Sequence, residues 1–128
     1  MRIHATCLIA ALALAGCAKA DAATVDPNND YDCAITFRVF REVANAQGAP
    51  DKARQGLFIM EQWYSAKWDH DHANTPDPAD HGDAIIKAMS LNPVAYKEPL
   101  KACTERAAAD PHFDRFARLM QQRMPDAR

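Results

Sequence analysis

The residues best suited to chemistry in this sequence gather in residues 69–83. This stretch contains five aspartates and three histidines, and it contains no lysine or arginine. Imidazole and carboxylate groups are the side chains that bind zinc and copper in proteins. In an extended backbone, alternate side chains point the same way, so two histidines separated by one residue could share a metal ion. The stretch therefore predicts a zinc or copper site made from His70, His72, His81, Asp69 and Asp71.

The same composition also fits a solvated connection between two helices. An aspartate between two prolines, as Asp77 is between Pro76 and Pro78, is typical of turns in which the carboxylate accepts a hydrogen bond from the nearby backbone. Without a metal, histidines among carboxylates could still respond to pH near neutrality. The sequence leaves both the metal site and the plain loop open.

Four cysteines divide by position into two near the N-terminus, Cys7 and Cys17, and two in the body of the chain, Cys33 and Cys103. Cys33 and Cys103 both fall in apolar stripes, so both should face the core. We expect them to form a structural disulfide, which would close a loop of roughly 70 residues and contribute about 4 kcal/mol in the chain-entropy model. A redox-active pair is disfavoured because the chain lacks the Cys-x-x-Cys spacing that lowers the pKa of one thiol.

The first 16 residues have one early cation followed by a run of small and apolar residues, which is typical of a secretory signal peptide. The run ends in Leu14-Ala15-Gly16-Cys17, which resembles the lipobox of bacterial lipoproteins. That resemblance implies cleavage before Cys17 and attachment of diacylglycerol to its thiol. An ordinary signal peptide cleaved after Ala18-Lys19-Ala20 is the alternative. By the same resemblance, the absence of aspartate at position 18 favours the outer membrane, with the protein facing the periplasm.

The elements that must position these residues are helices, because apolar residues recur at helical spacing throughout the mature chain. We expect residues 1–16 to be the signal peptide, residues 17–29 a lipidated cysteine and flexible tether, and residues 30–128 a single domain. The predicted fold is all-α, a small disulfide-stapled bundle of four or five helices. Their predicted ranges are residues 30–47, 51–69, 83–91 and 94–109, with a fifth helix opening at Asp110-Pro111. Gly48 should end the first helix, and Gly56 should mark a close helix crossing.

Composition excludes several classes of function. A formal net charge of -2 gives no basic excess with which to bind a phosphate backbone, so no nucleic-acid partner is expected. Neither serine, Ser65 or Ser90, lies in a nucleophile-elbow context, and there is no glycine-rich phosphate loop. We therefore expect a non-enzymatic envelope lipoprotein, held to the membrane by its lipid, whose helical domain binds another envelope component. A metal-binding or metal-sensing lipoprotein is the first alternative.

A second alternative comes from the placing of one cysteine, Cys33, in an early helix and the other, Cys103, in a late one. This arrangement is similar to that of periplasmic acid-stress chaperones, which are small, helical and disulfide-bonded. Those proteins are usually not lipidated, are smaller and lack the stretch of aspartates and histidines. The resemblance implies a small stress chaperone.

Overall fold

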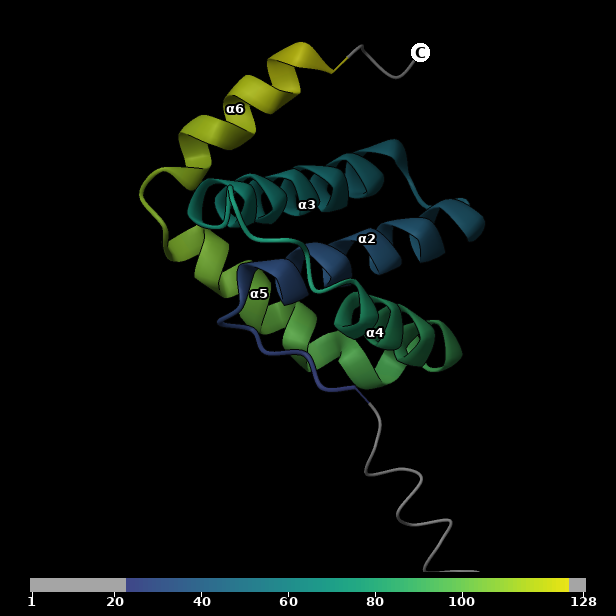
Figure 1. Cartoon of the computed structure of the whole chain (residues 1–128). Coiled ribbons are helices and arrows are strands. Elements are labelled where there is room, and N and C mark those ends of the chain that lie inside the picture. Colours follow the sequence, from purple (N-terminus) through teal and green to yellow (C-terminus); the bar gives the residue numbers. More distant parts are fainter. Residues whose placement is uncertain (1–22, 125–128) are drawn as a thin grey trace, which may run out of the picture.

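All regular structure in the described part of the chain is helical, as predicted for an all-α fold. The computed structural model describes residues 23–124, and the lipobox-like Leu14–Cys17 segment lies outside them. No helix of this part is both long and apolar enough to cross a membrane. The elements, shown in Figure 1, are α2 (Asp30–Ala46), α3 (Asp51–Asp71), α4 (Ala79–Leu91), the 3-10 turn η1 (Pro93–Tyr96), α5 (Lys97–Ala109) and α6 (Phe113–Arg123).

Helix α2 is the central element, and its ends follow from the local sequence. Its N-cap is Asn29, whose side-chain oxygen accepts hydrogen bonds from the backbone N–H groups of Tyr31 and Asp32. The helix ends as predicted before Gly48, which has a φ of 65° that a residue with a side chain rarely adopts. Every residue from Asp32 to Phe37 is buried, because α3, α4 and α5 all contact this helix.

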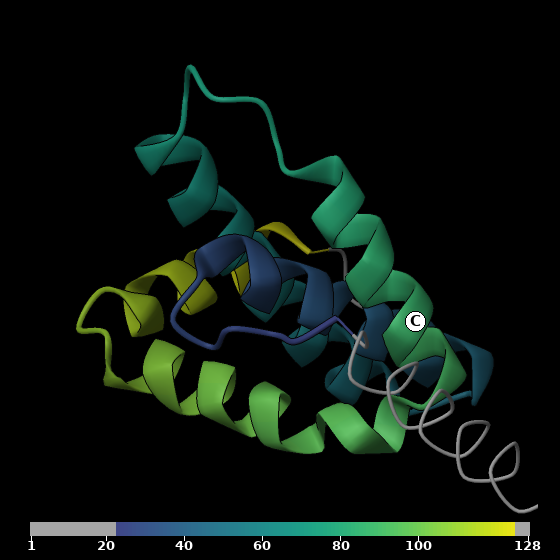
Figure 2. The ribbon, with the colours of Figure 1, turned by 60° about the horizontal axis from the view of Figure 1, so that its bottom comes forward.

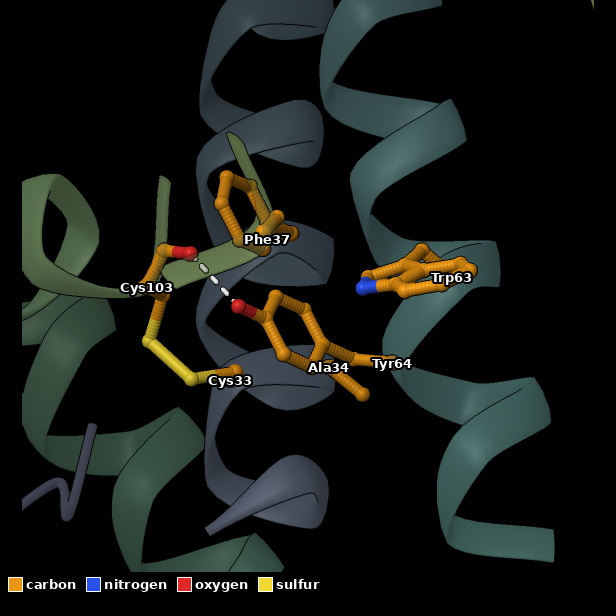
Figure 3. Close-up of a cluster of buried hydrophobic side chains, with 7 residues drawn as sticks. Cys33, Ala34, Phe37, Trp63, Tyr64 and Cys103 are labelled. Carbon is orange, nitrogen blue, oxygen red and sulfur yellow. Dashed lines mark hydrogen bonds between the residues drawn. A yellow bond between two sulfur atoms is a disulfide. The ribbon is translucent and has the colours of Figure 1, made fainter. Parts of the chain in front are cut away.

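One face of α2 packs against α3 and α5 in the first hydrophobic cluster (Figure 3). Phe37 and Tyr64 stack with ring centroids 6.0 Å apart, and the Tyr64 hydroxyl donates a hydrogen bond to the backbone carbonyl of Cys103. Trp63 packs against the rings of Phe113 and Phe116, which attaches α6 to α3.

The predicted disulfide between Cys33 and Cys103 is present within this cluster and joins α2 to α5. Both cysteines are fully buried, and their α-carbons lie 5.8 Å apart, within the range that a disulfide spans. The bridge joins residues 70 positions apart, so it removes much of the conformational freedom of the unfolded chain.

The opposite side of α2 forms a second cluster with α4, built on Ile35, Val39, Ile85 and Met89. The segment from Ala23 to Asn29 joins this cluster and runs across the bundle between α4 and α5 (Figures 1 and 2). The prediction of a flexible tether is therefore wrong for residues 23–29. Ala23 and Val25 pack on the second cluster, and the Tyr96 hydroxyl donates a hydrogen bond of 3.0 Å to the Ala23 carbonyl.

Several helix boundaries differ from those predicted. Helix α3 continues to Asp71 and α4 begins at Ala79, so the connection between them is shorter than expected. The predicted fourth helix is divided into η1 and α5, with Pro99 in the first turn of α5, where a missing N–H group costs nothing. Helix α6 begins at Phe113 because the Asp110 carboxylate accepts a hydrogen bond from the His112 N–H and forms a turn first.

The close approach of two helices occurs at Gly82, and the prediction for Gly56 is wrong. A Cβ atom on Gly56 would meet nothing within 4 Å. A Cβ atom on Gly82 would overlap the ring and hydroxyl of Tyr31, which in turn packs on Trp68 with ring centroids 5.3 Å apart. A side chain at position 82 would thus press α4 away from α2.

The two glycines provide a matched pair of substitutions with opposite effects on stability. Gly82→Ala should lower the free energy of unfolding by about 1 to 3 kcal/mol, because Tyr31 must leave its contact with Trp68. Gly56→Ala should raise it by about 0.5 to 1 kcal/mol, because alanine is the better helix former at an open position. Urea unfolding followed by far-UV circular dichroism measures both. Equal changes of the same sign would contradict the packing described here.

Candidate functional site

The three histidines of the predicted metal site face different partners. His70 lies on α3 with its side chain 87% exposed, and its Nδ1 is 3.0 Å from Oδ1 of Asp71. The hydrogen bond from this imidazole lowers the pKa of the Asp71 carboxyl. His72 stacks on the Trp68 ring with centroids 3.6 Å apart. His81 belongs to α4 and reaches the buried Asp32 of α2.

The expectation of a shared metal centre rested on an extended backbone, and the backbone there is helical. Because α3 continues through Asp71, side chains two positions apart point to nearly opposite sides of the helix. Asp69 and Asp77 both line a small polar cavity, and His81 is not among the residues that line it. Among residues 23–124 no group of three histidine, cysteine, aspartate or glutamate side chains is placed to hold a metal ion. The geometry therefore gives the zinc or copper interpretation no support.

A site that the sequence analysis missed is the buried carboxylate of Asp32, which is 2% exposed. Its Oδ1 lies 2.8 Å from Nε2 of His81, and its Oδ2 accepts a hydrogen bond of 2.9 Å from the Asp26 N–H. One carboxylate thus joins α2 to α4 and to the N-terminal segment. The available signal was an aspartate within the apolar stripe of α2, directly before Cys33.

A second buried carboxylate, which the sequence did not single out, is that of Glu61 on α3. Glu61 is 3% exposed, and its two oxygens lie 3.0 Å and 2.7 Å from Nε of Arg38 and Arg41. The hydrogen bond to Glu61 raises the pKa of the Arg41 guanidinium. A carboxylate held between two arginines on one neighbouring helix fixes how α2 and α3 pack, and this is a structural role.

The feature best suited to binding is an apolar groove of about 420 Å³ beside the C-terminal half of α2. Its walls come from α2, the start of α3, η1 and the start of α5. We call it the α2–α5 groove, and it is lined by Phe40, Val43, Ala44, Gln47, Ala49, Leu57, Pro93, Val94, Lys97 and Leu100. Its volume lies within the range typical of small-molecule sites. The sequence did not predict this groove, because its walls come from elements far apart in the chain.

The rim of this groove exposes large apolar side chains to water. Val94 lines the groove and is 66% exposed, and Leu91, three residues earlier, is 79% exposed. Across residues 23–124 only three large hydrophobic side chains are exposed, and the third, Leu119, is on α6. Two of the three are therefore concentrated at the junction of α4 and η1, as expected beside a binding surface.

The contact between Asp32 and His81 can be tested against an exposed histidine. His81→Ala should lower the free energy of unfolding by about 1 to 3 kcal/mol, because it removes a partner from a buried carboxylate. His70→Ala is the control and should change it by less than about 0.5 kcal/mol, because that side chain is exposed. Urea titrations of both variants and the wild type give the comparison. A loss for His70→Ala as large as that for His81→Ala would contradict the role given to Asp32.

Three comparisons with known proteins found no match. No family model matches the sequence, and no curated protein and no solved structure matches it either.

Proposed function

We propose that this chain is a non-enzymatic, lipid-anchored protein of the bacterial cell envelope, and that its helical domain is a binding module. The observation that carries the binding role is the α2–α5 groove, an apolar hollow of about 420 Å³ whose rim exposes Val94. A small domain gains stability by burying such side chains, so leaving them in water has a cost that binding would recover. The proposed ligand or partner is another component of the envelope.

The proposed anchor would hold this groove close to the membrane. The lipidated residue would be Cys17, six positions before Ala23. Six residues span at most about 22 Å when fully extended. The Ala23 carbonyl in turn accepts a hydrogen bond from Tyr96, the last residue of η1. The turn η1 forms one wall of the groove. A lipid on Cys17 would therefore keep the groove near the bilayer surface, and we place the protein on the outer membrane facing the periplasm.

Lipidation predicts a defined mass for the protein extracted from membranes. The mature chain should begin at Cys17, carry diacylglycerol on the thiol and be acylated on its new amine. Cys17→Ser should abolish the added mass, because serine lacks the thiolate that is alkylated. Cys7→Ser is the matched control, since that residue would be removed with the signal peptide, and the mature mass should not change. An unmodified N-terminus at Asp21 would show ordinary cleavage and refute the anchor.

The binding role is tested by photo-crosslinking in intact envelopes. A photoreactive amino acid at position 94 should give an adduct, because Val94 lines the groove and is exposed. The same amino acid at position 66 is the control, since Ala66 is exposed on α3 and does not line the groove. Adducts are compared by intact mass of the purified protein. No adduct at position 94, or equal labelling at both positions, would contradict binding in the groove.

A further inference from the structure

The charge and size of the α2–α5 groove indicate the chemistry of its ligand. Eight of its ten lining residues are apolar, and the two polar ones are Gln47 and Lys97. Among residues 23–124, no aspartate or glutamate lines it. Lys97 forms no ion pair with any of residues 23–124, and Glu98, its neighbour on the chain, does not line the groove. The groove thus offers apolar walls with one cation and one amide among its lining residues.

The size of the groove favours a small ligand over a protein. A stable protein interface uses about 20 to 30 residues on each side, whereas ten residues line this groove. Small-molecule sites are mostly apolar with a few polar groups that fix the orientation of the ligand, and this groove has that composition. A peptide segment would also bring backbone N–H and C=O groups, for which apolar walls provide no partners.

We propose that the α2–α5 groove binds a long-chain carboxylate, a free fatty acid. Its alkyl chain lies along Phe40, Leu57 and Leu100, and its carboxylate pairs with the ammonium group of Lys97 and accepts a hydrogen bond from the Gln47 amide. The charge complementarity is with a single anionic group, because Lys97 is the one cation of the described part of the chain that lines the groove. This inference rests on the proposed function for its setting, since the lipid anchor would keep the groove beside a bilayer that supplies fatty acids.

Binding is measured by calorimetry on the full mature chain carrying Cys17→Ser, which lacks the lipid and needs no detergent. Octanoate, decanoate and dodecanoate are titrated below their micelle concentrations. Each added pair of methylenes that enters the groove should tighten binding by about tenfold. Monolaurin, which is uncharged, and dodecyltrimethylammonium, which is cationic, should bind more weakly than dodecanoate by at least tenfold.

Substitutions separate the groove from the rest of the surface. Lys97→Gln should weaken dodecanoate binding at least fivefold and leave monolaurin unchanged, and Lys97→Arg should restore it. Lys101→Gln is the matched control, because Lys101 is one turn further along α5 and does not line the groove. Val94→Ser should weaken both ligands, since it removes an apolar wall without creating a buried cavity. Far-UV circular dichroism of each variant confirms that it is folded.

Several outcomes would overturn the proposal. These are no heat with any alkanoate, equal losses for Lys97→Gln and Lys101→Gln, or binding of the cation as tight as that of dodecanoate. Tighter binding of lysophosphatidylglycerol or of phosphatidylglycerol vesicles would show a lipid headgroup as the ligand, and self-association that Val94→Ser abolishes would show a second copy in the groove. A protein adduct at position 94 without alkanoate binding would leave the proposed function standing and reject this ligand.

Discussion

The disulfide between Cys33 and Cys103 is the constraint on which the arrangement of the C-terminal half depends. Helix α2 has long contacts with α3 and with α4, whereas it meets α5 over a much shorter stretch. The covalent bond fixes α5 against α2 at one point, and the hydrogen bond from Tyr64 to the Cys103 carbonyl holds the same point of α5 against α3. Because η1 continues directly into α5, the disulfide also influences where Pro93 and Val94 lie. The part of α5 that precedes Cys103, with Lys97 and Leu100, lines the α2–α5 groove beside this fixed point.

Buried polar groups give the remaining contacts their specificity. Apolar clusters in a bundle of this size tolerate several packings, but a buried carboxylate without partners is costly and so selects one of them. The Asp32 carboxylate has its partners only when α4 supplies His81 and the N-terminal segment supplies the Asp26 N–H. The Glu61 carboxylate has its partners only when α2 turns Arg38 and Arg41 toward α3. The register between α2 and its neighbours thus follows from these two carboxylates, and replacing one partner alone would leave a charge buried.

The proposed binding groove and the stretch of aspartates and histidines use different residues of the fold. The sequence suggested that the histidines and aspartates of residues 69–83 were best suited to chemistry. In the structure their hydrogen bonds lie at the end of α3 and between helices α2 and α4. The residues that form the groove are ordinary apolar side chains at helical spacing, which are indistinguishable in the sequence from core residues. They form a surface because the chain turns at Asn92 and Pro93, where the residues that the structure describes leave Leu91 and Val94 exposed.

The sequence by itself determined the helical class, the central α2 with its end at Gly48, and the pairing of Cys33 with Cys103, because these depend on periodicity, local φ preferences and the number of available thiols. It did not determine which glycine lies at a helix crossing, which carboxylates are buried, or where an apolar stripe is left uncovered. Those features depend on residues far apart in the chain, such as Tyr31 with Gly82 and Asp32 with His81. Only the tertiary structure decided them, because a helical stripe specifies that a face is buried and does not specify its partner.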